Sequence, residues 1–137
     1  MSPMASEGPI ECSVITPERE VLSAKVASVV FTAHDGQMGV LKNRAPFLGE
    51  LGTGVLRVTQ PSGSSSEFFV DRGFAHVHDN HVTILTEHSA AVGELSRTDA
   101  QAELAAAERM PAKGEAAAEV RRRAIQNARI KITLARK

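Results

Sequence analysis

Residues 73–85 read Gly-Phe-Ala-His-Val-His-Asp-Asn-His-Val-Thr-Ile-Leu, two alternating segments on either side of an Asp-Asn pair. Asp and Asn tolerate the positive φ angles of a two-residue hairpin turn. Valines on one side and histidines on the other have the period of two that is typical of half-buried strands. The stretch therefore predicts an antiparallel hairpin in which Val77 and Val82 face a core and His78 lies opposite His81.

The residues before this hairpin continue the pattern. Short alternating segments, such as residues 10–14, are separated by turn signals, of which residues 16–19 contain a proline. Residues 21–32 are rich in valine and predict one long or bent strand. Closely spaced strands of this kind are typical of small sandwiches and barrels. We therefore expect an N-terminal small antiparallel β-sandwich or barrel over residues 10–92, after a disordered extension over residues 1–9.

The period changes from two to 3.6 after the sandwich. Thr98 opens a capping-box pattern, so a helix is expected to start near it. Pro111 and Gly114 interrupt that helix, and a second helix is expected over about residues 115–136. Residues 93–137 are therefore expected to form an antiparallel α-helical hairpin.

Length and composition exclude several classes of protein. The 137 residues allow one domain with a short appendage, and the 42% hydrophobic and 23% charged residues are typical of a globular chain. No apolar stretch approaches the roughly 20 residues of a membrane-crossing helix, and residues 1–10 lack a basic flank followed by an apolar run. We expect neither membrane insertion nor an export signal. The single cysteine, Cys12, fits a reducing compartment.

The net charge of zero hides a difference between the two parts. Residues 1–92 carry ten acids and six bases, whereas residues 93–137 carry six acids and ten bases. Arg122, Arg129 and Arg136 recur every seven residues and predict a basic stripe on the second helix. The run Arg121-Arg122-Arg123 on the same helix has three interpretations: a solvated helix face, an acidic protein partner, and nucleic acid or anionic lipid. Residues 93–137 contain no Phe, Tyr or Trp and few large apolar anchors, which favours protein over nucleic acid and lipid.

Alanine dominates the expected helical hairpin. An alanine at a packing position contributes about 2 kcal/mol less on burial than a leucine, so an alanine-lined face docks weakly. Alanine is also the strongest helix former, so the helices can persist when they are undocked. Two interpretations stay open: helices that move as intact units, as in a switch, or an ordinary alanine-rich pair that is packed permanently.

Catalytic motifs are absent, because the chain has no Gly-rich phosphate loop, no Gly-x-Ser-x-Gly, no His-Glu-x-x-His and no Cys-x-x-Cys. Cys12 shares a strand face with apolar residues, and we expect a buried, inert thiol. His76, His78 and His81 project from one side of the predicted hairpin and could hold zinc together with water. The valine face already explains the alternation, and no carboxylate shares the histidine face near the turn. A metal-binding protein is therefore the alternative function.

The order of these features resembles the epsilon subunit family of the bacterial F-type, or rotary, ATP synthase, over nearly the whole chain. The resemblance lies more in the sandwich than in the helices. The residues that carry it are Thr16-Pro17-Glu18-Arg19, Asp35-Gly36, Gly39-Val40-Leu41, Asn43, Ala45-Pro46, Leu51, Gly54, Phe69-Val70, Gly73-Phe74 and Val82-Thr83-Ile84-Leu85. It implies a non-catalytic rotor subunit of the central stalk, without a cofactor, that couples proton flow through a membrane ring to rotation of the shaft and ATP synthesis.

The resemblance also implies partners for the sandwich, namely the gamma subunit and the c-subunit ring. Residues 34–46 occupy the family position that faces the ring. The implied contact residues are Asp35, Gln37, Met38, Asn43 and Arg44. The protein would then be peripheral, at the cytoplasmic face of the inner cell membrane.

The family's helical hairpin either folds against the sandwich or extends into the catalytic alpha/beta head, where it obstructs ATP hydrolysis. The implied head contacts are Arg122, Arg123, Arg129 and Arg136. Some members bind ATP through an Asp-x-x-Arg-Ala motif, and here Val120 replaces the aspartate, which argues against ATP binding. The chain also departs from the family in its ring-facing segment, where Lys42 and Arg44 make the expected surface more basic.

Overall fold

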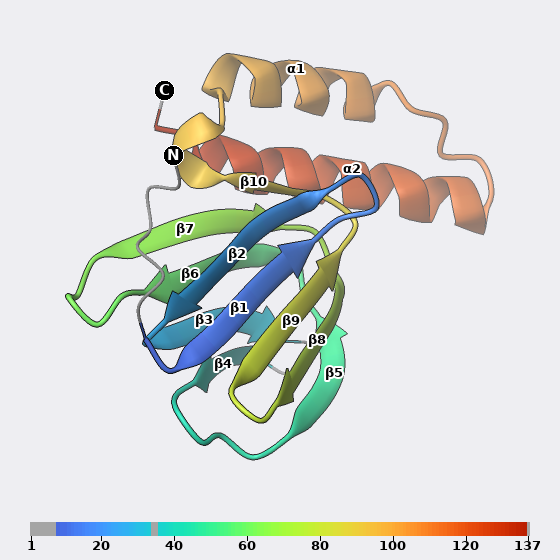
Figure 1. Ribbon diagram of the computed structural model, residues 1–137. Coiled ribbons are helices and arrows are strands. Elements are labelled where there is room, and N and C mark those ends of the chain that lie inside the picture. Colours follow the sequence, from blue (N-terminus) through green and yellow to red (C-terminus); the bar gives the residue numbers. More distant parts are fainter. Residues whose placement is uncertain (1–7, 34–35, 137) are drawn as a thin grey trace. The chain divides into compact units, whose positions relative to one another are not determined.

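The computed structural model describes residues 8–33 and 36–136 (Figure 1). The chain divides into two compact units, Met1–Ala91 and Val92–Lys137. Within the described residues the first unit consists of strands and the second of helices. Asp35 and most of the expected disordered extension lie outside the described residues.

The described part of the first unit contains ten strands. They are β1 (Ile10–Ile15), β2 (Glu20–Val26), β3 (Ser28–Ala33), β4 (Gly36–Val40), β5 (Phe47–Leu51), β6 (Gly54–Thr59), β7 (Ser65–Val70), β8 (Gly73–His78), β9 (His81–Thr86) and β10 (Ser89–Ala91). Their order is β10-β7-β6-β3-β5-β8-β9-β1-β2, and β4 pairs with β3 off this path, from Val29 opposite Val40 to Ala33 opposite Gly36.

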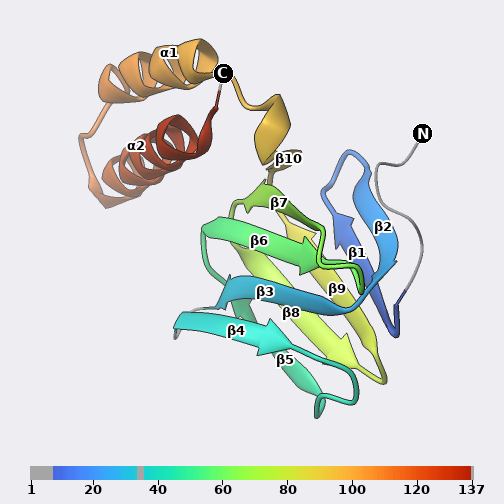
Figure 2. The ribbon, with the colours of Figure 1, turned by 90° about the vertical axis from the view of Figure 1, so that its left-hand side faces the viewer.

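Two layers of strands enclose the core (Figure 2). One layer holds β10, β7, β6, β3 and β4, and the other holds β5, β8, β9, β1 and β2. Ala33 and Leu51 are the residues that pair β3 with β5, so the ladder between the layers is short. The expected β-sandwich is confirmed.

One pairing differs from the antiparallel expectation. β1 and β9 run parallel, with Cys12 opposite Val82 and Val14 opposite Ile84. The physical reason is that these strands are far apart in the chain, so no tight turn forces them to be antiparallel. β1 has its antiparallel neighbour on the other side, in β2.

The core is built by alternation along the strands. In β1, for example, Ile10 and Val14 are buried and Glu11 is exposed. The rings of Phe31 and Phe47 lie 6.5 Å apart between their centroids. The largest fully buried side chains of the sandwich core include Phe31, Ile10, Leu56, Ile84, Val14, Val26, Val29, Val40, Val58, Val70 and Val77.

The valine-rich segment of residues 21–32 is divided between β2 and β3. The division falls at Ala27, whose N–H donates a hydrogen bond of 2.7 Å to the carbonyl of Thr59. β2 pairs with β1, whereas β3 pairs with β6. The bend at Ala27 therefore carries the chain from one layer to the other.

The predicted hairpin forms with the expected register. Val77 lies opposite Val82 and His78 opposite His81, and both valines are buried. Asp79 and Asn80 have φ angles of 51° and 63°, the left-handed conformation that a two-residue turn requires at both positions.

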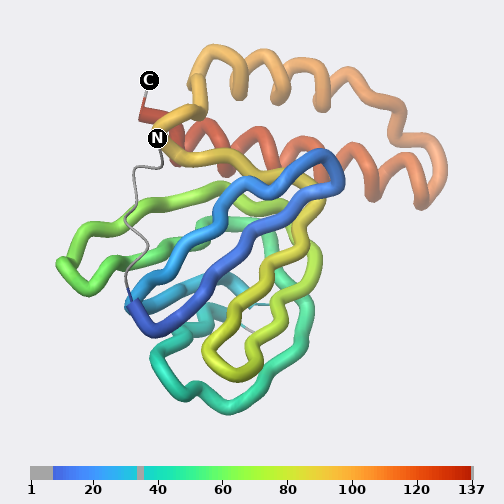
Figure 3. Tube along the Cα trace, viewed as in Figure 1, coloured from blue at the N-terminus to red at the C-terminus, as the bar shows by residue number. Residues whose placement is uncertain are grey.

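The second unit contains a short 3₁₀ turn (η1, Val92–Glu94), α1 (Arg97–Glu108) and α2 (Glu115–Leu134). The tube in Figure 3 shows the two helices joined as a hairpin. α1 starts at Arg97, close to Thr98 as predicted, but its N-cap is Ser96 and not Thr98: the Ser96 hydroxyl accepts a hydrogen bond of 3.2 Å from the N–H of Asp99. α2 ends at Leu134, so Arg136 lies beyond the helix on which it was expected.

Polar contacts join α1 to the region of α2. The Arg97 guanidinium donates to the carbonyl of Ala135 at 2.9 Å, and Lys131 Nζ lies 3.1 Å from Glu103 Oε2. The buried residues of the two helices are all alanines, Ala100 and Ala107 in α1 and Ala128 in α2. These helices therefore bury small side chains, as the alanine-rich sequence predicts.

Candidate functional site

An exposed turn connects β4 to β5. The N–H of Arg44 donates to the carbonyl of Leu41 at 3.2 Å, which closes a four-residue turn around Lys42 and Asn43. Asn43 holds the third position with a φ of 65°, a conformation that Asn adopts more readily than most residues. The turn therefore has a defined backbone shape.

Asn80 ties this turn to the neighbouring strands. The N–H of Asn43 donates to Asn80 Oδ1 at 2.7 Å, and Asn80 Nδ2 donates to Asn43 Oδ1 at 3.3 Å. The carbonyl of Asn80 also accepts a hydrogen bond of 2.9 Å from the N–H of Glu11. The β4–β5 turn, the β8–β9 turn and the start of β1 together form what we call the loop end of the sandwich.

The structure divides the residues implied for ring contact into two groups. Gln37 is exposed near the start of β4, and Met38 is partly buried against the core. Asn43 and Arg44 lie past the other end of β4, in the loop end. At about 3.3 Å per strand residue, the strand places roughly 10 Å between Gln37 and that end. Asp35 lies outside the described residues.

The three histidines lie on one side of the β8–β9 hairpin, as predicted. The rings of His76 and His78 stack with centroids 6.2 Å apart, and His78 pairs with His81. Within residues 8–33 and 36–136, no three His, Cys, Asp or Glu side chains form a group that could hold a metal ion. The geometry therefore gives the metal-binding alternative no support.

His81 instead makes an ion pair across the parallel strands. Its Nε2 lies 2.6 Å from Glu11 Oε2, and its Nδ1 lies 3.0 Å from the carbonyl of Asp79. The Asp79 carbonyl, and then the Glu11 carboxylate, raise the pKa of His81 above its ordinary value of 6.5. Glu11 also forms an ion pair with Lys25, whose Nζ lies 3.9 Å from Glu11 Oε1.

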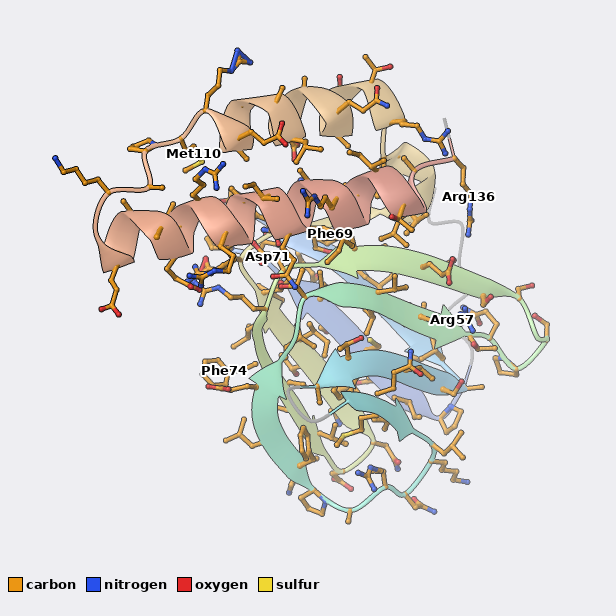
Figure 4. The ribbon with its side chains drawn as sticks, turned by 180° about the vertical axis from the view of Figure 1, so that it is seen from behind. Arg57, Phe69, Asp71, Phe74, Met110 and Arg136 are labelled. Atoms are coloured by element: carbon orange, nitrogen blue, oxygen red, sulfur yellow. The ribbon has the colours of Figure 1, made fainter. Side chains whose placement is uncertain are left out.

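The outer face of the same layer, formed by β5, β8, β9, β1 and β2, also carries apolar side chains. Phe74 of β8 and Leu85 of β9 are paired across the strands and are 53% and 49% exposed. Together with Ile15 and Pro17 they line a shallow depression, which we call the apolar patch. Figure 4 shows the Phe74 side chain extending outward from its strand. Exposed apolar groups of this kind mark interaction sites when they are contiguous.

Sequence reasoning did not assign a role to this patch, although a signal was present. Phe74 has the same parity as His76 and His78, so the alternation that turns the histidines outward also turns Phe74 outward. Leu48 of β5, which is 71% exposed and pairs with His76, extends the apolar character of this face.

The arginines of the second unit are less uniform than the predicted stripe. Arg122 forms an ion pair with Glu119, and Arg123 lies 3.6 Å from the same carboxylate. Arg122 and Arg129 are exposed on α2, and Arg136 is exposed after its end. Part of the positive charge of the Arg121–Arg122–Arg123 run is therefore balanced within the helix.

The single cysteine lies in the core of the sandwich. Cys12 is buried, with 1% of its surface exposed, and burial raises the pKa of its thiol to about 12. Such a thiol stays protonated and unreactive, as expected.

Val120, at the position of the family's ATP-binding aspartate, is 52% exposed on α2 and offers no polar group to a nucleotide.

No helix in the described part of the chain has the length and apolar character needed to cross a bilayer.

Comparison with known families identifies the sandwich. Residues 9–91 match the family model of the ATP synthase delta/epsilon chain β-sandwich domain. The ATP synthase epsilon chain of Rhodopirellula baltica is 40% identical over 120 residues, which cover 88% of this chain and 93% of the relative. That of Granulibacter bethesdensis is 35% identical over 95 residues, or 69% of this chain and 70% of the relative.

Solved structures share the fold. A chain in the Euglena gracilis mitochondrial ATP synthase matches with a TM-score of 0.75 and 22% identity, over 95% of this chain and 83% of its own length. A chain in the central stalk and c-ring of the Tetrahymena thermophila mitochondrial ATP synthase matches with a TM-score of 0.60 and 15% identity, over 94% and 98%.

Proposed function

The chain belongs to the ATP synthase delta/epsilon family, and from this membership we propose that it is the epsilon subunit of the central stalk of an F-type ATP synthase. It is a regulatory and structural subunit and not the catalytic one. The observation that carries the proposal is the 40% identity to an epsilon chain over 88% of this chain, which extends past the sandwich into the helices.

The apolar patch supports a contact with the gamma subunit. Burying the exposed halves of Phe74 and Leu85 against a partner would contribute about 1 kcal/mol each. A rotating shaft needs attachment by a rigid surface, and these side chains stand on paired strands of the sandwich rather than on a loop. The patch is therefore the surface that we assign to the shaft.

The ring contact is assigned to the residues that the family resemblance implies, Asp35, Gln37, Met38, Asn43 and Arg44. Gln37, Asn43 and Arg44 are exposed and available to a partner. Met38 is partly buried against the core, so its contribution would be to hold the backbone of β4. Through these contacts the sandwich would transmit proton-driven rotation of the ring to the shaft during ATP synthesis.

The helical hairpin is the proposed regulatory element, which inhibits ATP hydrolysis when it reaches the alpha/beta head. Its helices bury alanines, which keep a helix stable while contributing little to docking. A few kcal/mol of differential contact would then change which position of the hairpin dominates. The head contacts would be Arg122, Arg123, Arg129 and Arg136.

A chain with these partners would be peripheral, at the cytoplasmic face of the inner cell membrane. No helix of the described residues crosses a bilayer, so attachment would come from the partners.

Co-purification tests the assignment. The full chain, mixed with the gamma subunit of its own organism, is expected to form a stable complex on size exclusion, and absence of a complex would overturn the proposal. Removal of residues 96–137 from the assembled enzyme is expected to raise ATP hydrolysis. Unchanged hydrolysis would remove the inhibitory role while leaving the stalk assignment in place.

A further inference from the structure

Two cationic side chains stand exposed at the loop end. Lys42 and Arg44 flank Asn43 in the β4–β5 turn, and all three are exposed. Residues 36–49 contain no Asp or Glu. Among the residues that the structure describes, neither cation takes part in an ion pair.

The rest of the loop end does not neutralise this charge. Glu11 is occupied by His81 and Lys25, at 2.6 and 3.9 Å. Asp79, in the β8–β9 turn, is the remaining carboxylate of the loop end, and His78 precedes it in the chain. With Lys25 offsetting Glu11, the cations Lys42 and Arg44 outnumber the remaining carboxylate, Asp79, by one.

The two cations are held on a fixed backbone. The Leu41–Arg44 hydrogen bond closes the turn, and the two hydrogen bonds between Asn43 and Asn80 fasten it to the next hairpin. Leu41 stands beside Lys42 with 66% of its surface exposed. A turn whose backbone is already fixed loses less conformational entropy on binding than a flexible loop would.

We propose that this surface, Leu41, Lys42 and Arg44, binds an acidic segment of a protein partner, with carboxylates opposite the two cations and an apolar group against Leu41. Under the proposed function that partner is the membrane ring, whose stalk-facing loops would then carry Asp or Glu in this enzyme. The inference rests on the proposed function only for the identity of the partner.

Other anionic partners fit less well. Binding to anionic lipid uses clusters of about four to eight basic residues, and the turn has two. Single-stranded nucleic acid is held by stacking on aromatic rings. The nearest aromatic residue, Phe47, is partly buried and packs on the core.

The test uses the full chain, with the gamma subunit and the detergent-solubilised ring of the same organism as separate probes. The Lys42→Glu/Arg44→Glu variant reverses both charges, and Arg19→Glu/Lys113→Glu is the matched control, with the same change in net charge at two other exposed sites. We expect the first variant to bind the ring at least about tenfold more weakly and to lose most of the salt dependence of binding, whereas the control binds as the unmodified chain does. Both variants should bind the gamma subunit normally.

Equal ring affinity of the two variants would overturn the inference. It would also be overturned if the full chain bound vesicles of phosphatidylglycerol and phosphatidylcholine, with loss of that binding in Lys42→Glu/Arg44→Glu, because the partner would then be lipid. Failure of the unmodified chain to bind the gamma subunit is a separate result and would overturn the proposed function instead.

Discussion

The backbone N–H of Asn43 lies 2.7 Å from the side-chain oxygen of Asn80, 37 residues further along the chain. This hydrogen bond fastens the β4–β5 turn to the β8–β9 turn, and a second one from Asn80 Nδ2 returns to Asn43 Oδ1. The position of the two loop-end cations thus depends on a residue in another hairpin.

Replacing Asn80 by glycine tests this dependence. Glycine keeps the φ of 63° without strain but removes both side-chain hydrogen bonds. We expect Asn80→Gly to lower the free energy of unfolding by about 1 kcal/mol in urea denaturation and to speed hydrogen exchange at the Asn43 amide. Asn80→Asp is the control, since it keeps the acceptor oxygen. Equal exchange rates in the two variants would show that the hydrogen bond does not hold the turn.

The His81–Glu11 pair predicts a pH dependence of stability. The pKa of His81 is raised in the folded chain, so the folded state binds this proton more tightly than the unfolded state does. The stabilisation is fully present below pH 6.5 and is lost as the pH rises through the folded pKa. We expect an NMR titration to place the His81 pKa above 6.5, and Glu11→Gln to lower it. Urea midpoints measured between pH 5 and pH 8 should decline less steeply in His81→Gln, and an identical pH profile would contradict the assignment.

Features of the fold that depend on neighbouring residues could be predicted from the sequence. Features that depend on contacts between segments far apart in the chain could not. The turn and register of the β8–β9 hairpin were predicted, because Asp79 and Asn80 specify the turn locally and the alternation specifies the faces. The parallel pairing of β1 with β9 was not predicted, because it depends on packing between segments that are far apart in sequence. The N-cap of α1 was misassigned because Ser96-x-x-Asp99 and Thr98-x-x-Gln101 are both capping patterns, and local sequence does not choose between them.

The same distinction applies to the candidate site: some of its features follow from local sequence and others do not. The outward orientation of Phe74 follows from the parity of β8, so the apolar patch was accessible to sequence reasoning. The hydrogen bonds between Asn43 and Asn80 were not accessible to it, because no sequence pattern within either turn indicates a partner 37 residues away. The same holds for the separation of Gln37 from Arg44, which follows from residues 36–40 forming a strand.

Gly73 is a position where the backbone excludes a side chain. Its φ is 138°, and a Cβ built there would overlap the carbonyl oxygen of Leu85. We expect Gly73→Ala to lower the free energy of unfolding by about 2 kcal/mol or more, measured by urea denaturation. Gly39→Ala is the control, because no atom lies within 4 Å of a Cβ at that position. Similar stability of the two variants would show that β8 can shift away from β9.

The alanines of α1 predict a contrast between neighbouring positions. Ala107 is 2% exposed, whereas Ala106 is exposed. Because Ala107 is buried, a leucine there is expected to overpack its surroundings. Ala107→Leu should destabilise the helical hairpin by about 2 kcal/mol, and Ala106→Leu by less than about 0.5 kcal/mol. Hydrogen exchange of the α1 and α2 amides measures the two effects. A stabilising Ala107→Leu would mean that the hairpin is underpacked and not closely fitted around alanine.

The apolar patch predicts a variant that keeps the fold and loses a partner. Phe74 and Leu85 are each about half exposed, so replacing both with serine removes little core packing. We expect Phe74→Ser/Leu85→Ser to change the free energy of unfolding by less than about 1 kcal/mol, and to weaken binding to the gamma subunit by roughly tenfold or more, because a partner would bury just these side chains. Leu41→Ser is the control, since it removes an exposed leucine from the loop end, which we assign to the ring. Titration calorimetry with the gamma subunit compares the three proteins, and equal affinities would show that the shaft contacts another face of the sandwich.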